Sequence, residues 1–99
     1  MGVELAQAYS RLGARVTIFT EHLLVKEEAE VSEVVRQVFE REGIQIIAEK
    51  AQSVSNVSGG VSVRSSNHRQ TCDLLFVAAG RTPTLDGLNC EAAGVRFTE

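Results

Sequence analysis

The chain has 99 residues, enough for one small domain with a modest hydrophobic core and too few for two cofactor-binding domains. Its net charge of −3 argues against a nucleic-acid groove, which requires a surplus of basic residues. No run of 18 apolar residues is present, so the sequence predicts no membrane span. It also shows no charged and apolar leader of a secretory signal, and we therefore expect a cytoplasmic protein.

The first predicted unit is a helix followed by a strand. Apolar residues recur with the spacing of a helix that buries one face: Leu5, Ala8, Tyr9 and Leu12. Gly13 follows at the usual position of a left-handed C-cap. The β-branched and aromatic residues of 15–20 then predict a strand.

The second unit repeats this order more clearly. Its apolar stripe consists of Val31, Val34, Val35, Val38 and Phe39. Glutamates crowd the start, Arg41 lies in the last turn, and Gly43 ends the helix before a strand that opens at residues 44–47. Helix, glycine and strand in succession, twice over, predict an α/β fold with parallel strands.

The middle of the chain has a different amino-acid composition. Residues 51–71 are small, polar and β-branched, with Gly59 and Gly60 at the centre. Alternating valines on both sides of this pair predict a hairpin with a glycine turn. A second turn at residues 67–68 predicts a third short strand, so the segment is expected to form an antiparallel meander.

A continuous apolar run follows at residues 73–79. Such a run is typical of a strand buried on both faces of a sheet. It ends at residues 80–83, Gly-Arg-Thr-Pro, which cannot continue a strand. We expect the last sixteen residues to be mostly irregular.

The cysteines give no sign of redox or metal chemistry. Cys72 and Cys90 lie far apart in the sequence and fit neither a CxxC redox pair nor a metal knuckle. We expect reduced, mostly structural thiols and no metal site.

Three features stand in order along the chain: Gly2-Val3-Glu4 at the start of a helix, two helix–strand units followed by a hairpin excursion, and the run Val77-Ala78-Ala79-Gly80-Arg81-Thr82-Pro83. Together they resemble the NAD(P)-binding domain of the flavin-dependent pyridine nucleotide–disulfide oxidoreductases, within which the chain looks most like mercuric reductase and dihydrolipoamide dehydrogenase. Residues 2–6, Gly-Val-Glu-Leu-Ala, match the end of the family's GxGxxGxE fingerprint. Residues 12–17 look like its helix-to-strand turn, and residues 79–83, Ala-Gly-Arg-Thr-Pro, resemble its ATGRxP segment. The resemblance covers essentially the whole chain. It implies a truncated NAD(P)-binding domain over residues 1–99, a partial Rossmann-like three-layer α/β fold that has a parallel sheet without its first strand and an antiparallel β-meander.

The resemblance also assigns roles near the nicotinamide. Gly2 would be the fingerprint's third glycine, which lets the helix pack tightly against the sheet. Glu4 matches a family glutamate near the nicotinamide, although an acid in a first turn also simply favours the helix dipole. Ala79 and Gly80 would bring backbone close to the nucleotide, although Gly80 can also be a strand-ending glycine.

Cofactor choice depends on the residues after the second strand of the resembled fold. NAD-binding relatives place an acid there for the ribose hydroxyl, whereas NADP-binding relatives place a base for the 2′-phosphate. Thr20 stands where the acid would fall, and Glu21 after it would repel a 2′-phosphate. Lys26 lies near a position that is basic in NADP-using members. The cofactor is therefore NAD or NADP, with NAD favoured, and a solvated Glu21 with no role is an equal alternative.

The chain departs from the family pattern in ways that limit chemistry. It has no CxxxxC helix, FAD-binding sequence or interface domain with a catalytic histidine, so FAD is implied only for the full-length family. The fingerprint's first two glycines, whose N–H groups bind much of the pyrophosphate, are not in the chain. We expect no catalytic residue, weak or no nucleotide binding, and no reductase activity from this chain alone.

Three functions follow from these expectations. The chain is the nucleotide-positioning part of a flavin-dependent NAD(P)H disulfide or metal-ion oxidoreductase, a stand-alone dimeric α/β interaction module, or a gene remnant. A sheet without its first strand would leave backbone groups unpaired on residues 15–20 and 73–79. Exposed edges template pairing with another chain, so we predict a homodimer that closes the sheet, with no nucleic-acid or membrane partner.

Overall fold

A computed structural model describes residues 1–24 and 27–96 of the chain. Its first half contains helix α1 (Gly2–Arg11), strand β1 (Thr17–Phe19), helix α2 (Ala29–Arg41) and strand β2 (Gln45–Ile47). The two strands pair in parallel, with Ile18 opposite Ile46. Both predicted helix-to-strand turns are confirmed, because Gly13 and Gly43 have φ of +101° and +82° in the left-handed region that glycine tolerates.

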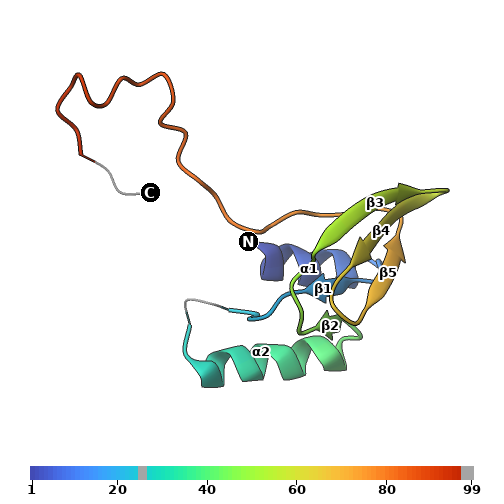
Figure 1. Cartoon of the computed structure of the whole chain (residues 1–99). Helices are drawn as coiled ribbons and strands as arrows, with labels where there is room; N and C mark the ends of the chain where they lie inside the picture. Colours follow the sequence, from blue (N-terminus) through green and yellow to red (C-terminus); the bar gives the residue numbers. More distant parts are fainter. Residues whose placement is uncertain (25–26, 97–99) are drawn as a thin grey trace.

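The second half begins with an antiparallel meander of β3 (Ser53–Val57), β4 (Gly60–Arg64) and β5 (Arg69–Cys72). The three strands lie side by side in the order β3-β4-β5, in a sheet separate from β1 and β2 (Figure 1). The predicted glycine hairpin and third strand are both confirmed. The chain is thus a mixed α/β fold with a small parallel sheet and a three-stranded antiparallel sheet.

The hydrophobic core is small. Four apolar side chains of the described residues are buried: Phe39, Ile44, Ile47 and Val63. Phe39 lies near the end of α2, Ile44 directly precedes β2, and Ile47 is the last residue of β2. The core therefore joins the second helix to the strand that follows it. Val63 is the buried apolar residue of β4, the central strand of the meander.

The prediction of a buried strand at residues 73–79 is wrong for this structure. The segment leaves β5 and passes the start of α1 as an extended trace without strand pairing (Figure 1). Leu74 is 81% exposed, Phe76 52% and Val77 74%. A strand buried on both faces needs a sheet to pair with and other elements packed over both faces, and no strand among the described residues pairs with this segment.

The expected burial of the first helix is also incomplete. Leu5 is half-buried, but Tyr9 and Leu12 of the predicted apolar stripe are exposed. The helix still forms from Gly2 to Arg11, because its sequence has strong helix formers and no internal proline.

No helix among residues 1–24 and 27–96 is long and apolar enough to cross a membrane.

Candidate nucleotide cleft

A cleft of about 540 Å³ opens where the parallel strands end. Thr20 follows β1 and Ala48 follows β2, so both strands point their carboxyl ends into it. The N-terminal half of α2 forms the opposite wall through residues that share one helix face: Ala29, Ser32, Glu33 and Arg36. In open α/β sheets, ligands bind in the crevice outside the carboxyl ends of the strands, and this cleft has that position.

The turn after β1 is held in shape by its own polar groups. The Thr20 hydroxyl donates to the backbone oxygen of His22 at 2.7 Å. The Thr20 backbone N–H donates to the Ile47 oxygen at 3.1 Å, which extends the parallel ladder by one residue. Glu21, between Thr20 and His22, is exposed at the cleft. The turn therefore presents a carboxylate that pairs with no side chain in the described part of the chain, on a backbone held by the two Thr20 hydrogen bonds.

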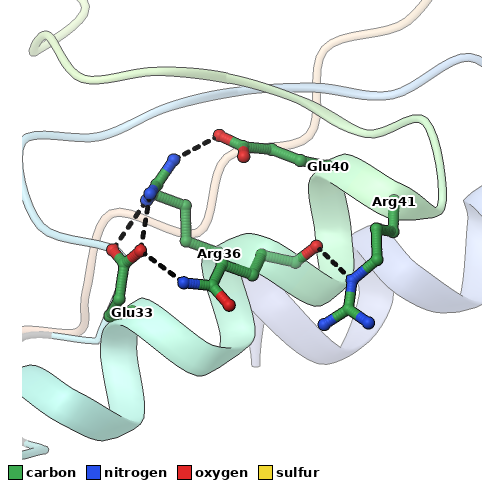
Figure 2. Close-up of polar contacts among 5 residues, drawn as sticks. Glu33, Arg36, Glu40 and Arg41 are labelled. Carbon is green, nitrogen blue, oxygen red and sulfur yellow. Dashed lines mark hydrogen bonds and ion pairs between the residues drawn. The ribbon is translucent and has the colours of Figure 1, made fainter.

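An ion-pair cluster lines the helical wall. The Arg36 guanidinium contacts Glu33 at 2.6 Å and Glu40 at 2.6 Å, and Gln37 donates to Glu33 at 2.8 Å. Figure 2 shows Arg36 between the two carboxylates, all on α2. These pairs have the i,i+3 and i,i+4 spacing that places side chains on the same helix surface.

The cluster shifts the acidity of its members. Hydrogen bonds from Arg36 and then from Gln37 lower the pKa of Glu33 to about 2. The same contacts with Glu33 and Glu40 raise the pKa of Arg36 above its already high value. Arg36 is therefore a permanent cation, but two carboxylates already occupy its donors. A ligand phosphate would have to compete with them.

The residues predicted from the fingerprint form a second group, away from the turn after β1. A Cβ on Gly2 would lie 3.0 Å from the Cβ of Ala78, so the start of α1 packs closely on the segment that contains Ala79 and Gly80. Gly80 has φ of +124°, and a Cβ there would meet no atom within 4 Å. Gly2 thus lies at a close approach to Ala78, which belongs to no strand. Gly80 has no such neighbour, and a glycine there permits the positive φ of the backbone.

Glu4 does not line the large cleft. The Glu4 carboxylate pairs with the amino group of Met1 at 2.9 Å and is exposed. It borders a smaller hollow of about 200 Å³ between α1 and α2, whose wall includes Gln7 and Phe39. Lys26 lies outside the described residues. Of the seven predicted cofactor residues, Thr20 and Glu21 alone among the described ones line the large cleft.

Sequence reasoning missed the helical wall. Ser32, Glu33 and Arg36 line the cleft, but none was singled out from the sequence. Their signal is the periodicity of α2: together with Ala29 they have the i, i+3, i+4, i+7 spacing of one face, beside the apolar stripe. His22 also lines the cleft.

A separate polar cluster joins β2 to the meander. Glu49 accepts hydrogen bonds from the backbone N–H and the side-chain amide of Asn67, both at 3.0 Å, and lies 3.1 Å from Nδ1 of His68. The Ser65 hydroxyl, then the two groups of Asn67, lower the pKa of Glu49 to about 2. The carboxylate therefore stays ionised and anchors the turn between β4 and β5.

Comparison with known proteins identifies a matching family and relatives that are similar in sequence. A protein-family model described as "Pyridine nucleotide-disulphide oxidoreductase" matches residues 1–99. Mercuric reductase from Acidithiobacillus ferrooxidans is 37% identical over 97 residues, which are 96% of this chain and 18% of that protein. Dihydrolipoyl dehydrogenase from Chlorobaculum tepidum is 37% identical over 103 residues, a match that covers 96% of this chain and 22% of that protein. The chain spans about a fifth of the length of these curated relatives.

Solved structures give the same result. The HOCl-induced flavoprotein disulfide reductase RclA from Escherichia coli superimposes with a TM-score of 0.82 at 28% identity. The match covers 99% of this chain and 23% of that protein. Because the family model spans every residue of the sequence, the chain belongs to the pyridine nucleotide-disulphide oxidoreductase family.

Proposed function

We propose that this chain is the nucleotide-positioning part of a flavin-dependent NAD(P)H oxidoreductase and that it binds the adenosine end of the cofactor in the cleft beside β1 and β2. The observation that carries the proposal is the position of the cleft at the carboxyl ends of two parallel strands, against the wall of α2. Family membership supports it, because the family is named for its pyridine nucleotide.

The donor set of the cleft fits a dinucleotide that ends in a free ribose. Glu21 offers an exposed carboxylate, which can accept hydrogen bonds from the ribose hydroxyls. A 2′-phosphate would meet Glu21 and Glu33, and the one described cation of the wall, Arg36, is already paired twice. These charges favour NADH over NADPH, and Lys26, outside the described residues, is the competing candidate for a 2′-phosphate.

The chemistry of the proposed parent enzyme would be supplied by groups this chain does not contain. The nicotinamide would deliver a hydride to a flavin, and this chain's residues would bind and orient the nucleotide. Cys72 and Cys90 are half-buried free thiols on separate parts of the fold, so they offer no disulfide for a flavin to reduce. We therefore propose that the chain alone binds nucleotide weakly and has no reductase activity.

Calorimetric titration of the purified chain with NADH and separately with NADPH, up to millimolar ligand, tests this proposal. We expect saturable binding of NADH and weaker binding of NADPH. Glu21→Gln should weaken NADH binding about tenfold, because a hydrogen bond to a charged group contributes about 1.5–3 kcal/mol. The same variant should narrow the preference for NADH over NADPH.

Glu91→Gln provides the matched control, since Glu91 is exposed and does not line the cleft. It removes the same charge and should leave both titrations unchanged. Absence of heat with both nucleotides at millimolar concentration would contradict the proposal. Equal effects of the two substitutions would contradict the role of Glu21 while leaving the cleft itself in place.

A further inference from the structure

Arg36 is the one arginine or lysine among the described residues that line the nucleotide cleft. Three carboxylates share the lining with it, those of Glu21, Glu27 and Glu33. Arginine binds phosphate most strongly when two parallel N–H groups on one edge of the guanidinium donate together. The cleft thus contains the side chain that would bind a nucleotide phosphate, beside an excess of negative charge.

The Nε–Nη2 edge of the Arg36 guanidinium is already occupied by Glu33. Nε donates to Oε2 of Glu33 at 2.9 Å and Nη2 donates to Oε1 at 2.6 Å, so this contact is bidentate. The remaining nitrogen, Nη1, donates to Glu40 at 2.6 Å (Figure 2). A carboxylate of the chain itself therefore takes the edge that a phosphate would use.

Glu33 is held in this position and in its charged form. The Gln37 amide donates to Oε1 of Glu33 at 2.8 Å from the next turn of α2. Hydrogen bonds from Arg36 and then from Gln37 lower the pKa of Glu33 to about 2. The carboxylate is therefore negative at any pH near neutrality. Unlike Glu40, Glu33 also lines the cleft, so its charge faces a bound ligand.

We propose that Glu33 determines cofactor specificity by occupying the phosphate-binding edge of Arg36, which keeps a site for the 2′-phosphate of NADPH closed. This role rests on the proposed function, because it requires the adenosine end of the nucleotide to lie in the cleft. A 2′-phosphate that approaches Arg36 must displace the Glu33 carboxylate and then remain beside a like charge. A ribose hydroxyl carries no charge and needs no such displacement.

The closed site should open when the charge of residue 33 is removed. The side chains of Arg36 and Glu33 are 43% and 47% exposed. Ion pairs at such exposure contribute little to stability, so α2 should stay folded without this one. Glutamine at position 33 keeps the size of the side chain but holds the guanidinium less strongly, because a neutral amide replaces the charged carboxylate.

Calorimetric titration of the full 99-residue chain with NADH and with NADPH tests this role, because the two ligands differ by the 2′-phosphate alone. We expect Glu33→Gln to raise the affinity for NADPH relative to NADH by about threefold to fivefold, as for other interactions between exposed charges. The gain should shrink at high salt, since salt screens exposed charges. Adding Arg36→Gln to this variant should remove the gain, because the phosphate then loses its donor.

Glu30→Gln and Glu40→Gln are the matched controls on the same helix. Glu30 is exposed and does not line the cleft, so the loss of its charge should leave the NADPH-to-NADH ratio unchanged. Glu40 contacts Arg36 but does not line the cleft, so its substitution should change the ratio less than Glu33→Gln does. Circular dichroism of each variant checks that the helices are retained.

The outcomes separate this role from the proposed function. If NADH binds and Glu33→Gln leaves the ratio unchanged, the role of Glu33 is overturned and the proposed function stands. An equal gain in Glu30→Gln, or a gain that survives Arg36→Gln, would also overturn it, because the effect would then come from net charge and not from Arg36. Absence of binding by both nucleotides, in the unmodified chain and in Glu33→Gln, would contradict the proposed function and this role together.

Discussion

Gly60 is required by the close approach of two strands rather than by its own backbone angles. A Cβ at this position would lie 2.2 Å from the carbonyl oxygen of Cys72, closer than any real contact. Gly60→Ala must therefore push β5 away from β4. We expect the free energy of unfolding to fall by about 1–3 kcal/mol, as for other overpacked sites, measured by urea denaturation.

Its neighbour Gly59 offers a matched control. Gly59 has φ of +81°, and a Cβ there would meet no atom within 4 Å. Asparagine tolerates such a left-handed conformation, so Gly59→Asn should change stability far less than Gly60→Ala. Equal losses from the two substitutions would show that turn conformation, and not the contact with Cys72, limits this hairpin.

The Glu49 carboxylate makes the free energy of unfolding depend on pH. Its hydrogen bonds with Ser65 and Asn67 lower its pKa from 4.5 to about 2. A group whose folded pKa is depressed stabilises the fold above its unfolded pKa, and this contribution is lost as the pH falls through the folded pKa. The contribution of Glu49 is therefore complete above pH 4.5 and disappears between pH 4.5 and about 2.

The substitution Glu49→Gln should reduce the loss of stability over this pH interval. Measurement of the free energy of unfolding from pH 6 to 2 would show a shallower acid slope than in the unmodified chain. Some slope should remain, because Glu33 also has a pKa of about 2 and titrates in the same interval. An unchanged slope in Glu49→Gln would contradict the hydrogen-bonded carboxylate at the β4–β5 turn.

At the scale of elements, the contact of α2 with β2 holds the first half together. Phe39 is 2% exposed at the end of α2, whereas Val34 on the same helix is 59% exposed. We expect Phe39→Ala to cost about 3–5 kcal/mol, enough to remove cooperative thermal unfolding from a chain with so small a core. Val34→Ala should change stability by less than about 0.5 kcal/mol, measured in the same calorimetric scans.

Elements defined by local signals were predictable from the sequence. Gly13 and Gly43 end their helices as expected, because the left-handed conformation after a helix is a property of one residue. The meander follows in the same way from its turns and alternating valines. The segment 73–79 was not predictable, because an apolar run becomes a strand only when another strand pairs with it.

The candidate site was predictable where it follows a strand and not where it lies on a helix. Thr20 and Glu21 were placed correctly at the carboxyl end of β1, because position after a strand fixes position in the cleft. Arg36 was missed, since a charged residue on an amphipathic helix usually faces solvent. Its participation depends on how α2 lies over β2, which the local sequence does not encode.

The whole molecule is less compact than its length suggests. The Cα radius of gyration is 17.2 Å, whereas a compact domain of 100 residues has about 13 Å. The excess comes from the chain after β5, which extends away from both sheets (Figure 1). The folded body is therefore built by the residues up to Cys72, and the remainder adds length rather than core.

This difference predicts the order of proteolysis. Trypsin should cleave after Arg81 before it cleaves after Arg64, because Arg81 lies in extended backbone without strand pairing among the described residues and Arg64 in the central strand of the meander. Mass spectrometry of timed digests would identify the first fragment. First cleavage after Arg64 would show that the meander, and not the extended segment, opens most easily.

The two sheets also differ in how far along the chain their partners lie, and this distance governs the order of folding. In the meander, paired residues such as Ser53 and Arg64 are near neighbours in sequence, whereas Thr17 must find Gln45 across the whole of α2. Closing the longer loop costs more chain entropy before any contact repays it. We expect the meander to form first during refolding and to act as the nucleus on which the parallel pair is later assembled.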